Sequence, residues 1–154
     1  DIGAAEDKAT IRGQGDLGYE MSECCQPVPG DLIVGVVDDA DRVHVHRHDC
    51  LQALKADVYG RLMTLEWKES VEVTFPVSIE VLAYDRFGLL HDITGILMRE
   101  HTNVQSTTTL TDRQNNRVSI KMVIEVVQLN KLLQTLEKIK QLPNVTSARR
   151  TVSS

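Results

Sequence analysis

The sequence is poor in aromatic residues and in clustered positive charge. Phe, Trp and Tyr together make up 4% of the 154 residues, so we expect aliphatic cores. The formal net charge of -5 argues against sequence-independent clamping of a phosphate backbone, because that binding mode depends on clustered Lys and Arg. A local basic contact stays open.

Long apolar runs are also missing. No run of about 18 apolar residues occurs, and no basic-then-apolar leader opens the chain, so neither a membrane span nor a secretory signal is expected. We therefore expect a cytoplasmic protein without a membrane partner. The P-loop, GxSxG and HExxH motifs are missing too, and no catalytic residue is assigned.

Cysteine is scarce, and two of the three cysteines are neighbours. The odd count fits a reduced compartment better than a disulfide framework. Cys24, Cys25 and Cys50, together with His46, offer thiolate and imidazole ligands of the kind that zinc prefers. Cys24 and Cys25 lack the usual two-residue spacer, so packing of small polarizable side chains, or a surface contact, is the alternative that spacing alone favours over zinc. His44 and His48 are alternative ligands or polar surface residues.

The first third of the chain predicts a small α+β module over residues 20–68, preceded by a linker over 1–19. The linker is expected because scattered Gly and charge show no apolar period. Alternation predicts strands over 31–37 and 42–48 that form a hairpin. So small a module needs help from a metal, a partner or a neighbouring domain.

One helix and one further strand complete this module. Asp49 and Gln52 have the capping-box spacing, which predicts a helix over 50–56 with Asp49 as N-cap. A strand is expected over 61–67, and a polar break over 68–70 then precedes the second domain.

Residues 71–152 show stronger patterning and predict a ferredoxin-like βαββαβ domain with two helices on one face of a four-stranded sheet. Period-2 segments alternate with two segments of helical period. The strands are expected over 72–85, 103–112, 117–127 and 145–152, and the helices over 89–101 and 129–142. The fold class is therefore α+β.

The turn DRFGLLHD, residues 85–92, is the second place where a ligand could bind. A glycine turn from a strand into a helix presents free backbone N–H groups that hold carboxylates or other anions. Most such turns bind nothing, so this motif alone is weak.

Two motifs in tandem resemble a known family. CCQPVPGDLIVGV, followed by VHRHDC, resembles the conserved-cysteine module of long RelA/SpoT-family (p)ppGpp synthetase/hydrolases, also called the zinc-finger or ribosome-intersubunit domain. FPVSIEVLAYDRFGLLHDITGIL is similar to the start of the ACT domain that follows it. The resemblance covers about residues 20–152.

This resemblance implies the C-terminal regulatory end of a stringent-response enzyme, a GTP pyrophosphokinase or (p)ppGpp hydrolase, without its catalytic domains. The fragment itself is then not an enzyme. Cys24, Cys25, His46 and Cys50 match conserved positions, with zinc as their implied metal. The module is implied to contact ribosomal RNA when the parent senses uncharged tRNA. The candidate contacts are Arg42, His46, Arg47 and Asp49, which could equally form a solvated strand face.

ACT domains commonly bind small ligands, often amino acids, and associate through their sheets. The resemblance implies a homodimer and a branched-chain amino acid as ligand, although an ACT fold used only for packing stays open. Phe87 is bulky enough to block or cap the pocket. The candidate ligand-binding residues are Asp85, Arg86, Gly88, Leu89, Leu90, Asn103 and Val104.

The leading hypothesis is a regulatory fragment that couples ribosome and amino-acid status to catalytic domains elsewhere. One alternative is a freestanding ACT-type amino-acid sensor. Another is a zinc-dependent enzyme, which requires an open zinc position and a nearby general base.

Overall fold

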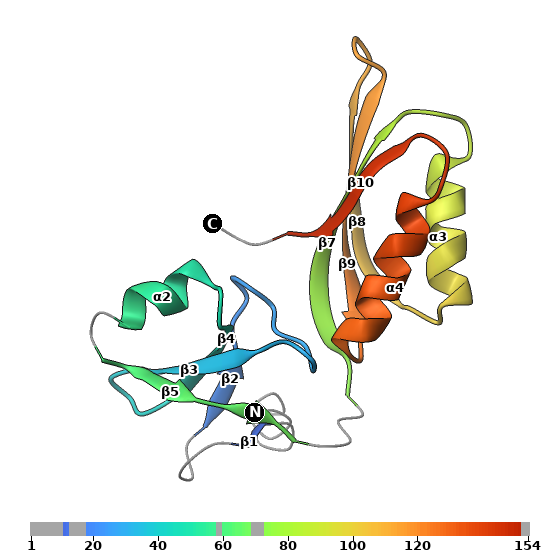
Figure 1. Cartoon of the computed structure of the whole chain (residues 1–154). Coiled ribbons are helices and arrows are strands. Elements are labelled where there is room, and N and C mark those ends of the chain that lie inside the picture. The colour runs from blue at the N-terminus through green and yellow to red at the C-terminus, as the bar shows by residue number, and fades with distance from the viewer. Residues whose placement is uncertain (1–10, 13–17, 58–59, 69–72, 152–154) are drawn as a thin grey trace. The chain divides into compact units, whose positions relative to one another are not determined.

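The computed structural model describes residues 11–12, 18–57, 60–68 and 73–151 (Figure 1). The chain divides between Phe75 and Pro76 into two compact units, each held together by contacts among its own residues. The boundary expected after residue 68 falls next to residues 69–72, which lie outside the described part.

The first unit contains a four-stranded sheet in the order β2-β4-β3-β5. β3 and β4 form the predicted antiparallel hairpin, and β2 runs parallel to β4 with Met21 opposite Val45. The strands are β2 (Tyr19–Met21), β3 (Ile33–Val37), β4 (Val43–Arg47) and β5 (Leu62–Thr64).

The linker expected over 1–19 is wrong at its described residues. Ile11 and Arg12 form strand β1 (Ile11–Arg12), which pairs antiparallel with β6 (Glu66–Trp67). Ile11 and Tyr19 are buried in the same apolar cluster as Val43 and Val45. Strands of two or three residues are too short to show a period, which explains why the sequence pattern missed them.

The single strand expected over 61–67 is divided in the structure. β5 belongs to the four-stranded sheet, whereas β6 pairs with β1. The buried Leu65 lies between them and joins the apolar cluster, so the chain changes sheets at a core residue.

Helix α2 (Leu51–Asp57) begins one residue later than predicted, and Asp49 is not its N-cap. The first helical hydrogen bond runs from the Leu54 N–H to the Cys50 carbonyl at 3.0 Å, which places Cys50 at the cap position. The Asp49 carboxylate instead accepts a hydrogen bond from Arg47 at 3.0 Å. The local ion pair therefore replaces the capping box.

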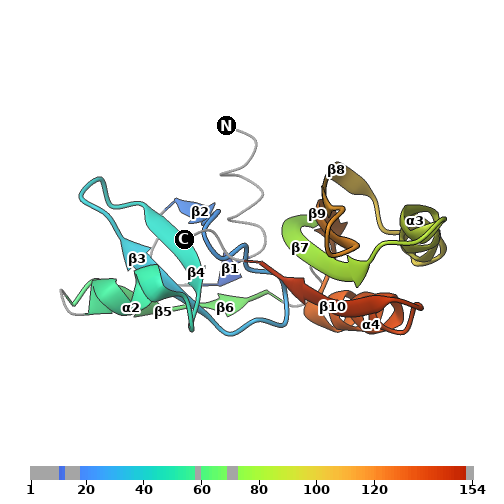
Figure 2. The same cartoon turned by 90° about the horizontal axis from the view of Figure 1, so that it is seen from above.

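The second unit has the predicted βαββαβ order. Its sheet runs β10-β7-β9-β8, with β10 antiparallel to β7 and β8 antiparallel to β9. Helices α3 and α4 lie against one face of this sheet (Figures 1 and 2). The elements are β7 (Phe75–Tyr84), α3 (Leu89–Arg99), β8 (Val104–Asp112), β9 (Arg117–Val126), α4 (Leu129–Lys140) and β10 (Val145–Arg150).

The core of the second unit lies between the helices and the alternate residues of the two central strands. It is aliphatic, as expected from the scarcity of aromatic residues. β8 lies at the sheet edge, and all its residues except the half-buried Val104 are exposed. The buried apolar residues of β7, β9, α3 and α4 include Val77, Ile79, Val81, Ile93, Leu97, Ile120, Met122, Ile124, Leu132 and Ile139.

Candidate metal centre and ligand turn

Cys24, Cys25, His46 and Cys50 lie together in the first unit. One ligand atom from each residue lies within 4.8 Å of all the others. The Sγ of Cys24 is 3.4 Å from His46 Nδ1, 3.6 Å from Cys50 Sγ and 3.9 Å from Cys25 Sγ. Cys25 Sγ is 3.7 Å from His46 Nδ1.

These four separations lie close to the edges of a tetrahedron around zinc, and the two that involve Cys50 with Cys25 and with His46 are within 4.8 Å. Zn–S bonds of about 2.3 Å and Zn–N bonds of about 2.0 Å require ligand atoms about 3.8 Å apart for two sulfurs and about 3.5 Å apart for sulfur and nitrogen. The four side chains therefore fit a tetrahedral metal ion by both donor type and spacing.

A tight turn makes the adjacent cysteines compatible with one site. Residues 23–25 form the turn, and the Gln26 N–H donates to the Ser22 carbonyl at 3.1 Å across it. Gln26 takes a left-handed conformation with φ 49°. This turn brings two neighbouring thiols to one point without the usual spacer.

β4 and α2 supply the other two ligands. His46 lies on β4 and is 8% exposed, and Cys50 stands at the start of α2. The Cys50 N–H donates to the Arg47 carbonyl at 3.0 Å, which closes the turn between β4 and α2. The site thus joins the domain entry to the hairpin and to the start of the helix.

Burial raises the pKa of a thiol, whereas backbone N–H donors lower it, and the balance of the two differs among the three cysteines. Burial raises the pKa of Cys24 and Cys25. Burial would also raise the pKa of Cys50, but the Ala53 and Gln52 N–H groups at the start of α2 and the two other thiols outweigh it and lower that pKa. Cys50 is therefore the cysteine whose thiolate the fold itself favours.

His46 is suited to ligation as a neutral imidazole. Burial, and secondarily the charge of His44, lowers its pKa. The neighbouring Arg47 N–H donates to Cys25 Sγ at 3.3 Å, which orients the Cys25 thiol toward the cluster. Three thiol groups and one neutral imidazole form a donor set typical of structural zinc sites.

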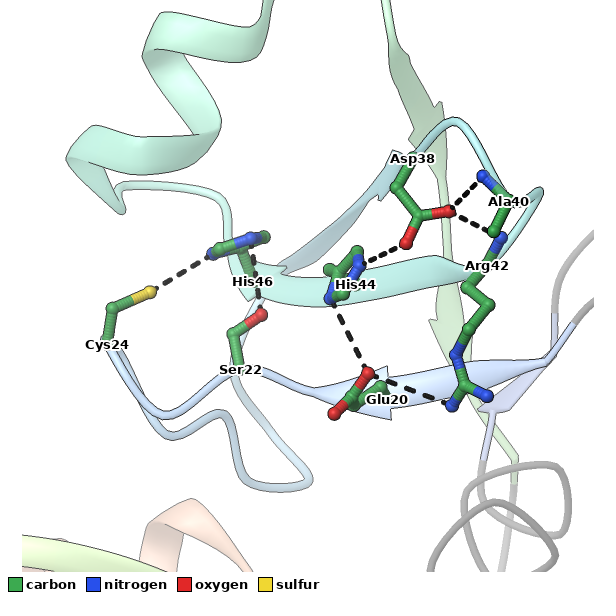
Figure 3. Close-up of polar contacts among 8 residues, drawn as sticks. All are labelled: Glu20, Ser22, Cys24, Asp38, Ala40, Arg42, His44 and His46. Atoms are coloured by element: carbon green, nitrogen blue, oxygen red, sulfur yellow. Dashed lines mark hydrogen bonds and ion pairs between the residues drawn. The ribbon is translucent and has the colours of Figure 1, made fainter.

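His44 and His48 are not part of this cluster. His44 Nε2 lies 2.8 Å from Asp38 Oδ2 and its Nδ1 lies 3.8 Å from Glu20 (Figure 3). This contact with His44 lowers the pKa of Asp38, assisted by the Arg42 N–H. His48 is exposed.

The candidate RNA-contacting cations are already paired with carboxylates. Arg42 lies 3.7 Å from Glu20, and Arg47 lies 3.0 Å from Asp49. The Asp49 side chain is exposed, whereas the His46 ring is turned toward the cluster. The His46 side chain is therefore part of the Cys/His cluster and is not presented to solvent.

In the turn before α3 of the second unit, the backbone takes a left-handed conformation that favours glycine. Gly88 has φ 79° and precedes α3. The Leu89 N–H already donates to the Arg86 carbonyl at 3.4 Å, and the Leu89 side chain is buried. Phe87 is 102% exposed, so its ring points into solvent and does not cap the turn.

Arg86 is tied down by two parts of the fold. Its Nε donates to the Pro143 carbonyl at 3.0 Å, and its guanidinium lies 2.9 Å from Asp92. Asp85 and Leu90 are exposed. The Asn103 carbonyl accepts the Glu125 N–H at 2.9 Å, and Val104 is half-buried at the start of β8.

Two cavities of the second unit lie elsewhere. One of about 320 Å³ lies beside the end of α3 and the start of α4, with Glu100, Ile124 and Lys131 in its wall. The other, of about 230 Å³, lies over the β8–β9 hairpin beside Leu82 and Arg117. None of the seven predicted ligand-binding residues lines either cavity, so the amino-acid site stays a prediction.

Sequence reasoning missed the polar groups that surround the metal ligands. Ser22 Oγ lies 3.2 Å from His46 Nε2, and the Arg47 N–H contacts Cys25. Ser22 precedes the cysteine pair by two residues, but its contact depends on the parallel pairing of β2 with β4. No residue pattern in the sequence reveals that pairing.

The four-ligand cluster does not favour a zinc-dependent enzyme. Catalytic zinc sites keep one position for water or substrate, whereas four protein ligands are characteristic of structural sites.

Within the described residues, no helix has the length and apolar character needed to cross a membrane.

Both units match known domain families. Residues 9–68 match the RelA/SpoT RIS domain, and residues 72–150 match an ACT domain. A crystal structure of the ACT domain from the GTP pyrophosphokinase of Chlorobium tepidum has a TM-score of 0.46 and 20% sequence identity, covering 51% of this chain and 99% of that chain.

Curated relatives extend the similarity across both domains. The chain is 37% identical over 145 residues to a GTP pyrophosphokinase of Escherichia coli (strain K12), covering 93% of this chain and 20% of that protein. It is 33% identical over 142 residues to a GTP pyrophosphokinase of Haemophilus influenzae, covering 91% and 19% respectively. The chain thus spans about a fifth of the length of these relatives. This chain belongs to the RelA/SpoT family, of which it carries the RIS and ACT domains.

Proposed function

We propose that this chain is a regulatory, binding-only region of a (p)ppGpp synthetase/hydrolase. It couples ribosome and amino-acid status to catalytic domains elsewhere in the parent protein. Such coupling works by population shift, because a ligand or the ribosome binds one arrangement of the enzyme better than another. The RIS and ACT matches support this reading over a freestanding amino-acid sensor.

The observation that carries the proposal is the cluster of Cys24, Cys25, His46 and Cys50. Zinc held by these four side chains would fix the entry turn, β4 and the start of α2 as one rigid surface. The ion supplies folding energy and no chemistry in such a site. The first unit then serves as a docking module.

For the docking partner we propose ribosomal RNA, in a complex that also holds uncharged tRNA. Arg42 immediately precedes β4 and Arg47 ends it, so the strand that carries His46 is flanked by two cations. Their pairing with Glu20 and Asp49 holds both guanidinium groups near the surface. RNA phosphates would compete with these carboxylates, which fits a local contact by an acidic protein.

Co-sedimentation of the zinc-loaded chain with ribosomes carrying uncharged tRNA tests this proposal. We expect Arg47→Ala to weaken binding and to lower the salt slope of the affinity by about 1, as loss of a phosphate contact does. Arg61→Ala is the matched control, since Arg61 is an exposed arginine paired with Asp39 in the same unit. Equal affinity and salt slope for wild type and Arg47→Ala would reject the RNA contact.

For the second unit we propose a branched-chain amino acid as ligand and a homodimer formed through the sheet. The left-handed Gly88 at the start of α3 supports the first, and the exposed edge strand β8 supports the second. The proposed contacts are Asp85, Arg86, Gly88, Leu89, Leu90, Asn103 and Val104. Calorimetric titration with valine, leucine and isoleucine is expected to give saturable heat, and Gly88→Val is expected to abolish that heat. No heat with any of the three amino acids would leave the ACT domain only a packing role.

A further inference from the structure

The two ring nitrogens of His46 face different surroundings. Nδ1 lies 3.4 Å from the Cys24 sulfur and 3.7 Å from the Cys25 sulfur. Nε2 lies 3.2 Å from Ser22 Oγ (Figure 3). Because the side chain is buried, each nitrogen depends on its protein partner rather than on bulk water.

The backbone holds Ser22 beside this ring. The Ser22 N–H donates to the Val45 carbonyl at 3.1 Å, which continues the parallel pairing of β2 with β4. The Ser22 carbonyl accepts the Gln26 N–H at 3.1 Å across the cysteine turn. Ser22 is therefore fixed to the strand that carries His46 and to the turn that carries Cys24 and Cys25.

The chemistry of imidazole assigns a role to this contact. A neutral imidazole carries one N–H, so a ring that ligates a metal through Nδ1 must carry its proton on Nε2. The hydroxyl oxygen of Ser22 is placed to accept that proton. Partners of this kind orient a metal-bound histidine and strengthen it as a ligand.

We propose that Ser22 is a positioning residue of the metal centre: its hydroxyl accepts the His46 Nε2–H and aims Nδ1 at the ion shared with the three cysteines. This inference rests on the proposed function of the cluster as a zinc site. It assigns a role to a residue that holds no metal itself.

Zinc affinity measured by competition with a chromophoric chelator tests the proposal in the full chain. We expect Ser22→Ala to bind Zn²⁺ 10- to 100-fold more weakly, as loss of a hydrogen-bond partner of a ligating histidine does. Ser22→Thr keeps the hydroxyl and is expected to restore affinity. Ser106→Ala, an exposed serine on β8, is the matched control and should bind as the wild type does.

Nitrogen-15 spectroscopy of the His46 ring supplies a second readout, and its measurement on the wild type does not depend on a variant folding. In the zinc-loaded wild type, Nε2 should carry a proton that exchanges slowly with water, and Ser22→Ala should speed that exchange. A rapidly exchanging proton in the wild type, or wild-type affinity in Ser22→Ala, would overturn the role of Ser22 alone. If the wild type binds no Zn²⁺, both the metal site and this inference fail.

Discussion

At the scale of single residues, Gly35 shows how tightly the first unit is packed. A Cβ atom added at Gly35 would lie 2.6 Å from Val43 Cγ1 and 2.8 Å from Met63 Cγ. Val43 is fully buried and β-branched, so it cannot turn away easily. The gap between β3 and its neighbours is therefore shaped for glycine.

We expect Gly35→Ala to lower the free energy of unfolding by about 1 to 3 kcal/mol, because overpacking outweighs the entropy that alanine normally saves. Urea unfolding followed by Trp67 fluorescence measures the change. Gly18→Ala is the control, because an added Cβ there meets nothing within 4 Å. Equal stability of the two variants would show that the core around Val43 relaxes freely.

The sequence predicts the members of the Cys/His cluster better than their surroundings. Zinc chemistry singles out Cys24, Cys25, His46 and Cys50, and the structure brings these four together. The capping-box spacing predicts Asp49 as a helix cap, but the charge of Arg47 two residues away competes for its carboxylate. Ser22 carries no comparable signal, because its role arises from strand pairing.

At the scale of elements, length decides what the pattern reveals. α3 and α4 have 11 and 12 residues, and β7 and β9 have 10 each, which is enough for a period to show. β1 and β6 have two residues each, and their pairing became visible only in the fold. The order of the ACT elements was therefore predictable, whereas the second sheet of the RIS unit was not.

One polar contact between the end of α3 and helix α4 is also not predicted by the sequence pattern. Glu100, which follows α3, is buried and accepts hydrogen bonds from Lys131 and Lys138 of α4. These two bonds lower its pKa to about 2. Glu100 lies 31 positions from Lys131 and 38 from Lys138 in sequence, so only the packing of α3 beside α4 brings the carboxylate to the two lysines.

At the scale of the whole molecule, the two units differ in how they gain stability. The second unit buries long aliphatic rows from two strands and two helices. Among the residues that the structure describes, the first unit has an apolar cluster of six buried residues, and domains of this size often need a metal or another staple. Zinc bound only by the folded RIS unit would add free energy to that unit alone.

Chelation should therefore destabilise one unit selectively. Zinc at 100 times its dissociation constant contributes about 2.7 kcal/mol, which for a small domain corresponds to a fall in Tm of about 10 °C or more when the ion is removed. Trp67 is the single tryptophan and packs against the apolar cluster of the first unit, so its fluorescence reports that unit. Amide exchange in β9 reports the second unit.

We expect a chelator to lower the Tm of the unfolding transition that Trp67 fluorescence follows. The amides of β9 should stay as protected from exchange as before. Cys25→Ser supplies the control, because a chain without this ligand should resemble the chelated wild type and respond little to further chelator. Equal loss of stability in both signals would contradict a metal effect confined to the RIS unit, since it would mean that the ACT core depends on the cysteine cluster as well.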